Sequence, residues 1–323
     1  MEEWQFAFGV DANYVKYAGV MMTSIVLNHS GQPVCFHLAC SGIDEADKVK
    51  LDEFTRLYRN TRIMIYDVRE LLKSVPEIVA GPERLNKTVF LRILLPNFLP
   101  KELTKVIYLD ADMLCIGRLD KLWQVELNNK AVAVSFYPKP CEHALRLHLK
   151  GEEYFNAGMM LMNLPIWRQQ KLTKQVLEVY KKHGKDFVLL EQDTLNCILE
   201  GQVIEISPCF NHMLEAFNPL QAKILPEDAI IHFVNEGKPW IRYCADEIEQ
   251  LYWSYVRRSL WFTMEPSEPW DVKTAFLAGQ NAQGRGEYKA AAYYLGIAAH
   301  QLMEFFLEKT NQVTGGQNIE KTK

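Results

Sequence analysis

Short apolar segments alternate with helix-like segments along the first third of the chain, and this alternation restricts the fold more than any other feature. The apolar segments have strand length, and the segments between them repeat their apolar residues at helical spacing. Strands are expected at 4–10, 33–40, 62–66 and 105–110, and helices at 14–29, 44–58 and 87–98. This β-α-β-α order predicts an α/β fold with a doubly wound, mostly parallel sheet and right-handed crossovers. Ligands of such sheets bind beyond the carboxyl ends of the strands.

The strand at 105–110 runs directly into two acidic residues. Asp110 and Asp112 follow the apolar or aromatic run Val106–Leu109 and are separated only by Ala111. Strand alternation would place both carboxylates on one side, roughly 6.5–7 Å apart at their bases. Two such carboxylates repel each other unless a cation lies between them, and Mg²⁺ or Mn²⁺ is a common partner. Considered alone, the pair is explained as well by two solvated acids that close a strand.

Composition and charge limit the class of protein. The chain has 323 residues, of which 48% are hydrophobic, which suits one large domain or a domain with an appendage. A net charge of −4 with both signs mixed gives no reason to expect a nucleic-acid partner. The seven cysteines form no C-x-x-C pair and lie mostly in apolar stretches, which predicts reduced core thiols. Neither a signal peptide nor a transmembrane segment is recognisable, so we expect a soluble cytoplasmic protein.

Polar residues also lie where other predicted elements meet. After the first strand, Asn13 could cap the next helix. Alternatively, Asp11 or Asn13 could hydrogen-bond a ligand, on whose ring Tyr14 could stack. The spacing there does not match a dinucleotide-binding glycine turn. A strand is expected at 154–164, followed by one long amphipathic helix from Pro165 to about residue 183. The small residues 156–158 in that strand either form a bend or allow a ligand to approach the backbone. Each of these features has a plain structural interpretation as well as a functional one.

The second half of the chain adds three further candidates. Glu191–Asp193 opens a helix, where the residues either complement its dipole or contact a substrate. His232 lies in an apolar strand at 229–234, and a lone histidine there is more often a core residue than a ligand. Lys238 follows at once on a loop with glycine and proline, and is a reasonable phosphate contact.

The last part of the chain is expected to be an appendage. A proline-containing linker is predicted at 263–269, a helical hairpin at 271–310 and a polar segment without fixed structure at 313–323. The apolar residues of the hairpin need a partner surface. We therefore expect either packing or self-association into a homo-oligomer.

Taken in order, these motifs resemble those of the family-eight retaining glycosyltransferases, which include bacterial lipopolysaccharide galactosyl- and glucosyltransferases and, more distantly, glycogenin. The resemblance extends over residues 4–262. It is carried by Asp11–Tyr14, Arg92, Tyr108–Asp112, Phe155–Gly158, Gln192–Asp193 and, after His232, Lys238–Trp240.

The resemblance implies a GT-A fold, Rossmann-like, in residues 1–262, with residues 263–323 as a C-terminal helical appendage. It implies Mn²⁺, for which Mg²⁺ could substitute, and UDP-glucose or UDP-galactose as donor. The implied acceptor is a glycan or glycolipid. The protein itself is expected to make at most weak peripheral contact with the inner face of the membrane. The implied metal ligands are Asp110, Asp112 and His232. The residues implied to hold the UDP-sugar are Gly9, Asp11, Asn13, Tyr14, Arg92, Asp110, Ala111, Asn156, Ala157, Asn235 and Lys238.

The resemblance further implies that Gln192 and Asp193 line the donor sugar as the catalytic pair. Retention requires either a nucleophile on the opposite sugar face or a same-face internal return. An amide oxygen is a poor nucleophile, so we favour same-face return with Gln192 stabilising an oxocarbenium-like sugar. One departure is Asn235, which stands where the family often has a glycine.

Two other classes fit part of the pattern. A phosphohydrolase with an aspartyl nucleophile also begins with an apolar strand and D-x-D, but it favours Thr or Val where this chain has Met113. A catalytically silent protein that binds a UDP-sugar or carbohydrate is the main alternative. UDP release with Mn²⁺ separates it from an enzyme.

Overall fold

The computed structural model describes residues 1–78, 87–218 and 222–315 of the chain. The chain divides into two compact units. Unit 1 comprises Met1–Met213, Ile224–His232 and Tyr255–Thr263, and unit 2 comprises Leu214–Lys223, Phe233–Ser254 and Met264–Lys323.

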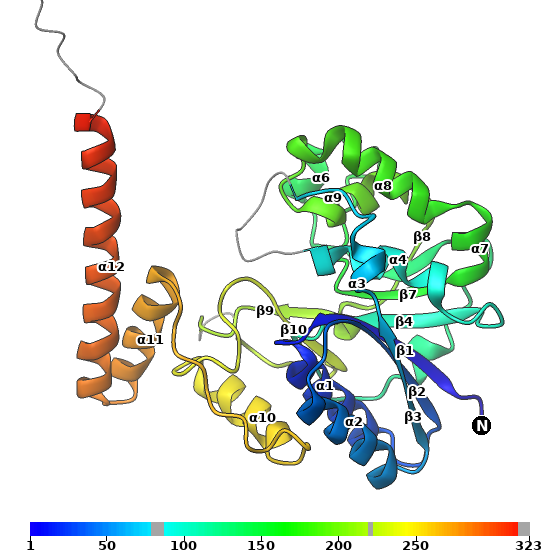
Figure 1. Cartoon of the computed structure of the whole chain (residues 1–323), viewed down its shortest axis with the longest axis horizontal. Helices are drawn as coiled ribbons and strands as arrows, with labels where there is room; N and C mark the ends of the chain where they lie inside the picture. The colour runs from blue at the N-terminus through cyan, green and yellow to red at the C-terminus, as the bar shows by residue number, and fades with distance from the viewer. Residues whose placement is uncertain (79–86, 219–221, 316–323) are drawn as a thin grey trace, which may run out of the picture. The chain divides into compact units, whose positions relative to one another are not determined.

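Unit 1 is built on a seven-stranded sheet that is mostly parallel, as predicted (Figure 1). In spatial order its strands are β3 (Thr61–Asp67), β2 (Val34–Ser41), β1 (Trp4–Asp11), β4 (Lys105–Leu109), β7 (Met159–Asn163), β6 (Val132–Val134) and β8 (Val203–Glu205). The first four strands are parallel, with Phe6 opposite both Phe36 and Ile107. β7 is the reversed strand, antiparallel to β4 and β6, and β8 runs parallel to β6.

Helices cover both faces of this sheet (Figure 1). One face carries α1 (Val15–Asn28) and α2 (Glu45–Leu57), and Phe36 of β2 packs edge-on against Phe54 of α2. The other face carries the η1 turn (Lys87–Phe90), α4 (Leu91–Phe98), α7 (Leu164–Gln169), α8 (Leu172–His183) and α9 (Leu190–Ile198). The remaining short helices of unit 1 are α3 (Arg69–Leu72), α5 (Asp120–Trp123), α6 (Glu142–Arg146), η2 (Gly184–Asp186) and η3 (Pro208–Phe210).

Two predicted elements differ from the observed ones. The single helix expected from Pro165 to about residue 183 is two helices, because Lys171 adopts a left-handed conformation with φ 54° that ends α7 before α8 begins. The strand expected at 154–164 is regular only over Met159–Asn163. Before Met159, Phe155 forms only an isolated bridge with Phe136.

A second, smaller sheet has three strands. In spatial order they are β5 (Met113–Cys115), β10 (Ile230–Phe233) and β9 (His212–Leu214). β5 and β10 are antiparallel, with His232 opposite Met113. This register brings His232 beside the residue that follows Asp112, although the two are far apart in the chain.

Unit 2 contains most of α10 (Asp246–Val256), and a hairpin of α11 (Val272–Gly284) and α12 (Tyr288–Gly315). Asp271 caps α11 by accepting the Thr274 N–H at 2.7 Å. The two helices approach closely at Gly279, where a Cβ would lie 2.7 Å from Leu295 Cγ. Arg285 joins the hairpin to the α10 region through Glu249, at 2.7 Å. The hairpin was predicted, and the boundary at residue 262 stays a prediction.

Residues 313–315 belong to α12 and so are not irregular as expected, while 316–323 lie outside the described residues. All seven cysteines are free, and Cys35, Cys40, Cys115, Cys141 and Cys244 are buried. Within the described parts of the chain, no helix combines the length and the hydropathy that spanning a bilayer requires.

Candidate active site

A cavity of about 190 Å³ lies at the carboxyl ends of β1 and β4. This is the edge at which a doubly wound sheet binds ligands. The cavity gathers predicted site residues from three separate parts of the sequence. Its lining consists of Gly9, Val10, Asp11, Tyr14, Thr88, Val89, Arg92, Tyr108, Asp110, Ala111 and Asp112.

The turn after β1 is organised by Asp11. Its Oδ1 accepts the N–H groups of Asn13 at 2.9 Å and of Tyr14 at 3.2 Å. The capping interpretation of Asn13 is therefore wrong: its side chain is exposed, α1 begins at Val15, and no side chain caps that helix. Tyr14 borders the cavity with its ring partly exposed, as a stacking residue would. Asn13 is not part of the cavity lining.

Asp110 is held from two sides within unit 1. Arg92 Nη2 donates to its carboxylate oxygens at 2.9 and 3.2 Å, and the Tyr108 hydroxyl donates to Oδ1 at 2.6 Å. Burial raises the pKa of Asp110, and the Arg92 guanidinium opposes that rise. Glu191 lies on the other side of Arg92, with Oε1 3.6 Å from Nε, and burial raises its pKa to about 7.

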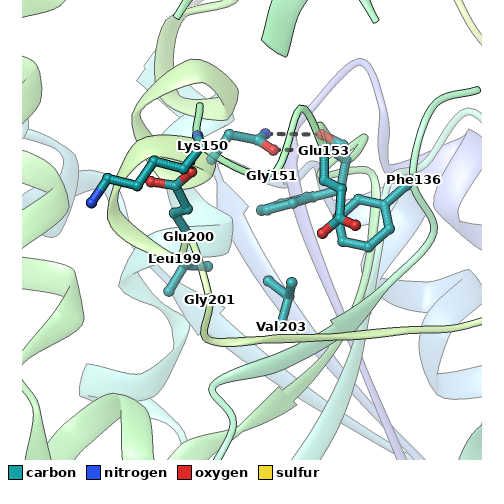
Figure 2. A pocket seen from close by; sticks show the side chains of 10 residues that line it. Phe136, Lys150, Gly151, Glu153, Leu199, Glu200, Gly201 and Val203 are labelled. Carbon is teal, nitrogen blue, oxygen red and sulfur yellow. Dashed lines mark hydrogen bonds between the residues drawn. The ribbon is translucent and has the colours of Figure 1, made fainter. Parts of the chain in front are cut away.

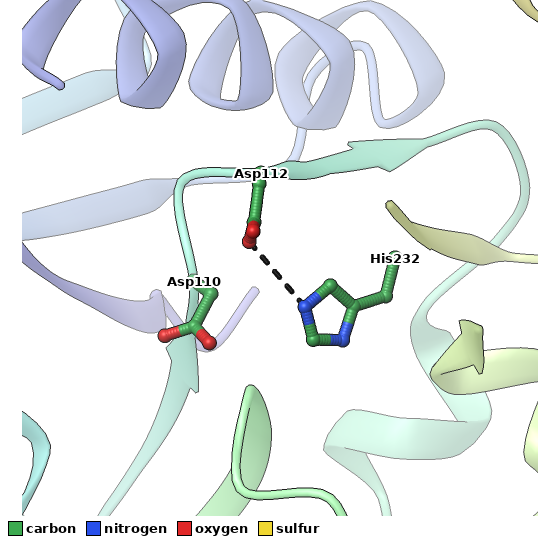
Figure 3. A group of neighbouring side chains, drawn as sticks. All are labelled: Asp110, Asp112 and His232. Carbon is green, nitrogen blue, oxygen red and sulfur yellow. Dashed lines mark ion pairs between the residues drawn. The ribbon is translucent and has the colours of Figure 1, made fainter. Parts of the chain in front are cut away.

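Asp110, Asp112 and His232 form a triad that could hold a cation (Figure 3). One ligand atom from each residue lies within 4.8 Å of the others, and His232 Nε2 is 3.4 Å from Asp112 Oδ1. The carboxylates do not extend a strand as predicted. β4 ends at Leu109, and residues 110–112 form the turn into β5. His232 lies in strand β10 and is buried, as a core residue would be, and its ring is directed at the two acids.

The hydrogen bonds around His232 select its ligating nitrogen. His232 Nδ1 is 3.0 Å from Asn211 Oδ1, and Asn211 Nδ2 donates to Asn156 Oδ1 at 3.2 Å. Because Asn211 Oδ1 can only accept, Nδ1 carries the proton and Nε2 keeps its lone pair toward the acids. Metal-ligating histidines are commonly oriented in this way. Two carboxylates with one imidazole fit Mn²⁺ or another divalent cation.

The turn at 156–158 packs directly against this triad. The Asp110 N–H donates to the Gly158 carbonyl at 2.8 Å. A Cβ on Gly158 would lie 2.4 Å from His232 Cε1 and 2.9 Å from Asp110 Oδ2. Close approach, rather than backbone conformation, therefore requires glycine at this position.

The side chains of α9 hold the same segment from the other side. The Ala157 N–H donates to Gln192 Oε1 at 2.9 Å, and Asn196 bonds the N–H and the carbonyl of Phe155 at 2.8 and 3.0 Å. Asp193 is fully buried and bonded to Tyr154 and Arg146. The structure thus brings the predicted residues Asn156, Ala157, Gln192 and Asp193 together next to the triad.

A second cavity, of about 410 Å³, lies beyond Phe155 (Figure 2). Its walls include the rings of Phe136 and Phe155 and the side chain of Val203, and its charged groups are Lys150, Glu153 and Glu200. None of the predicted site residues lines it.

Asn235 and Lys238 belong to unit 2. Asn235 has φ 62° and donates from Nδ2 to Glu215 Oε1 at 2.7 Å. Asparagine is one of the few residues other than glycine that adopt this left-handed conformation readily. Lys238 is buried and donates from Nζ to the Phe233 carbonyl at 2.5 Å.

For four residues of the site, no role was predicted from the sequence. Tyr108 and Tyr154 lie two positions before Asp110 and Asn156, and strand alternation could have placed each on the same face as its predicted neighbour. Arg146 ends the five-residue helix α6, and Asn211 lies between η3 and β9. Both segments are too short to show a period, and nothing in the sequence indicated either residue.

An α/β sheet with a triad that could hold a cation at the carboxyl ends of its strands is an arrangement found in enzymes that use nucleotides. The sequence pattern of glycosyl transferase family 8 matches residues 5–244. The chain belongs to this family and is a glycosyltransferase.

The relatives agree with this assignment. The chain is 23% identical to the lipopolysaccharide 1,3-galactosyltransferase of Salmonella typhimurium, over 94% of this chain and 93% of that protein. It is 25% identical to the lipopolysaccharide 1,2-glucosyltransferase of Escherichia coli, over 83% and 81%. General stress protein A of Bacillus subtilis is 27% identical, over 79% and 93%.

A solved structure supports the fold. The galactosyltransferase LgtC, in complex with donor and acceptor sugar analogs, superposes with a TM-score of 0.68 at 24% identity, over 80% of this chain and 96% of that one. The predicted α/β GT-A fold with C-terminal helices is therefore confirmed.

Proposed function

We propose that this protein transfers a hexose, glucose or galactose, from a UDP-sugar to a glycan or glycolipid acceptor, in a metal-dependent reaction that retains the anomeric configuration. The observation that carries the proposal is the triad of Asp110, Asp112 and His232 at one end of the cavity formed by Gly9, Asp11 and Tyr14. A nucleotide that enters this cavity meets polar groups at the β1 turn, and its phosphates face the triad.

The triad would hold Mn²⁺, with Mg²⁺ as a weaker substitute. Two carboxylates and one imidazole favour Mn²⁺ over the harder Mg²⁺. When bound, the cation supplies positive charge for the diphosphate, whose negative charge grows as the glycosidic bond breaks. Lys238 is proposed as a further cation for this group.

The chain's own residues position the donor. Asp11 and Tyr14 are proposed to hold the uracil and ribose, while Arg92 and Asn156 line the sugar. Arg92 is already fixed by Asp110 and Glu191, so its guanidinium is preorganised for the donor. The Ala157 N–H donates to Gln192 Oε1, which fixes the amide oxygen of Gln192.

The diphosphate leaves without a proton, so the mechanism needs no general acid. We favour same-face return, in which the Gln192 oxygen stabilises an oxocarbenium-like sugar. Trapping of a covalent sugar adduct on Gln192 or Asp193 would overturn this mechanism in favour of double displacement.

The acceptor class is proposed from the named relatives, which are lipopolysaccharide galactosyl- and glucosyltransferases. Work on such acceptors would place this protein in the cytoplasm at the inner face of the membrane. The exposed apolar residues of α12, Leu302, Met303, Phe305, Phe306 and Leu307, are proposed to pack against a second copy of the chain.

The test is UDP release from UDP-glucose and UDP-galactose, with Mn²⁺, Mg²⁺ or excess chelator, in the presence of cell-extract acceptors. We expect Mn²⁺-dependent release by the natural protein and a loss of at least about 100-fold in Asp112→Asn, because that change removes a charged metal ligand. Asp112→Asn should bind Mn²⁺ more weakly while keeping its melting temperature. Donor binding without turnover, unaffected by Asp112→Asn, would instead support a silent UDP-sugar-binding protein.

A further inference from the structure

Every oxygen lone pair of Asp193 is engaged by a hydrogen-bond donor. Its Oδ1 accepts from the Tyr154 hydroxyl at 2.6 Å and from Arg146 Nη2 at 2.9 Å. Its Oδ2 accepts from Arg146 Nη2 at 2.8 Å and from the N–H groups of Val188 and Leu189 at 2.8 and 3.0 Å. A carboxylate offers about four acceptor sites. Asp193 therefore has no lone pair left with which to attack a sugar.

This arrangement fixes the direction of the next hydrogen bond. An ionised carboxylate can only accept, so the single hydrogen of the Tyr154 hydroxyl is directed at Asp193. The Tyr154 oxygen must then accept, and it accepts from Gln192 Nε2 at 3.0 Å. Burial raises the pKa of Tyr154, so the hydroxyl keeps its proton.

The other end of the Gln192 amide agrees with this direction. Its Oε1 accepts the Ala157 N–H at 2.9 Å. A reversed amide would place Nε2 against that N–H, donor against donor, and would turn an oxygen toward Tyr154 that the Tyr154 oxygen cannot donate to. The chain of bonds from Asp193 through Tyr154 to Gln192 thus has a single consistent polarity.

We propose that Tyr154 is a positioning residue that transmits the acceptor character of Asp193 to the Gln192 amide and so keeps the Gln192 oxygen, rather than its NH₂ group, toward the donor sugar. The inference rests on the proposed function, in which Gln192 faces that sugar. An amide oxygen carries partial negative charge and stabilises a cationic sugar, whereas an NH₂ group there would oppose it. We call the hydrogen-bonded series Asp193–Tyr154–Gln192 the relay. Asp193 acts through this relay and is not itself a nucleophile.

The relay predicts an unusual order of activities. In Asp193→Asn the single oxygen is claimed by Val188 and Leu189, so an NH₂ group faces Tyr154. The hydroxyl must then accept from Asn and donate to Gln192, which reverses the amide, and we expect kcat to fall about 100-fold. In Tyr154→Phe the relay is cut and only Ala157 orients the amide, so we expect a fall of about 10-fold.

The double variant Asp193→Asn/Tyr154→Phe decides the matter. With no hydroxyl to transmit the reversed polarity, its kcat should return to the level of Tyr154→Phe, about 10-fold above Asp193→Asn. Donor KM should stay within about 2-fold in all three variants, because the triad is untouched. A double variant no more active than Asp193→Asn would overturn the relay and favour a direct chemical role for Asp193.

Tyr66→Phe is a matched control. The Tyr66 hydroxyl likewise hydrogen-bonds a side chain, His37 Nδ1 at 2.8 Å, and Tyr66 lies in the edge strand β3. Its loss should leave kcat and KM unchanged. A comparable fall in kcat would show that loss of any such hydroxyl lowers activity, and would count against the relay.

A readout that needs no turnover separates this inference from the proposed function. In protein labelled with ¹⁵N-glutamine, the amide pair missing from Gln192→Met identifies the Gln192 signals. We expect these protons to exchange slowly with solvent in the natural protein and at least about 10-fold faster in Tyr154→Phe. Unchanged exchange overturns the relay. Absence of UDP release from the natural protein refutes only the proposed function.

Discussion

Substitution of Gly158 by alanine offers a sharp test of the site, because it adds one methyl group at the point where the metal triad and the 156–158 turn meet. The new Cβ would lie 2.4 Å from His232 Cε1, 2.9 Å from Asp110 Oδ2 and 2.9 Å from Asn156 Oδ1. None of these atoms belongs to a side chain that can move away freely. The His232 ring is hydrogen-bonded to Asn211, and the Asp110 carboxylate is hydrogen-bonded to Arg92 and Tyr108.

The size of the effect follows from the overlap. Ordinary contact between carbon atoms needs about 3.5 Å, so the His232 ring must move by about 1 Å. Overpacking of this kind costs about 1–3 kcal/mol, which for a chain of this size lowers the melting temperature by about 1.5–4.5 °C. Displacement of one ligand should weaken Mn²⁺ binding and lower Mn²⁺-dependent UDP release by about 10–100-fold.

The assay measures melting temperature without metal, Mn²⁺ binding by titration calorimetry, and UDP release as a function of Mn²⁺ concentration. Gly296→Ala is the matched control, because no atom lies within 4 Å of its added Cβ and the position is in α12. That control should gain about 0.5–1 kcal/mol of helix stability and keep the natural activity. If Gly158→Ala melts at a lower temperature yet binds Mn²⁺ with natural affinity, the cation does not lie at this triad.

Two further predictions concern stability. His37 is buried and hydrogen-bonded to Gln5 and Tyr66, and burial lowers its pKa from 6.5 to about 4. Between these two pH values the unfolded chain binds a proton that the folded chain does not, so the free energy of unfolding falls as the pH drops from 6.5 to 4. Between pH 7.5 and pH 5, the free energy of unfolding measured with urea should therefore fall by about 2 kcal/mol less in His37→Gln than in the natural chain. Equal falls in the two proteins would contradict the lowered pKa of His37. Truncation after residue 262 removes the Arg285 bond to Glu249 and the Asn281 bond to the Tyr243 carbonyl, so we expect a lower melting temperature. It should also reduce the mass measured by light scattering to that of one chain, and a soluble truncated protein whose oligomeric state matches the full chain would contradict self-association through α12.

The sequence predicted the parts of the molecule that depend on local patterns. The alternation of strands and helices gave the sheet and its mostly parallel order, because each element carries its own period and the crossovers have one hand. The acidic pair at 110 and 112 was likewise visible as a motif. The geometry of the pair could not be predicted, because both residues lie in a turn whose shape depends on the pairing of β5 with β10.

The remaining parts depend on contacts between distant segments. Asn211 orients His232, and Arg146 pairs with Asp193 over 47 positions of sequence. Neither residue lies in a periodic segment, so the pattern that predicts helices and strands carries no information about them. The break at Lys171 was missed for a similar reason, since lysine rarely adopts a left-handed conformation and nothing local demanded it.

β7 begins later than expected because contacts with distant residues take the place of strand pairing over residues 154–158. A strand continued through 154–158 would direct its N–H groups to a neighbouring strand. Instead, the N–H groups of Phe155, Ala157 and Gly158 donate to side-chain oxygens of Asn196, Gln192 and Asn156. Because backbone donors are satisfied in this way, the segment can leave the sheet without an energetic penalty for unpaired groups. The same bonds fix Gln192 on one side of the segment and, through Asn156 and Asn211, His232 on the other. Gln192 and His232 are therefore connected through Ala157, Asn156 and Asn211, which fixes the separation between the Gln192 amide and the triad. A donor bound as proposed would need this separation to be constant.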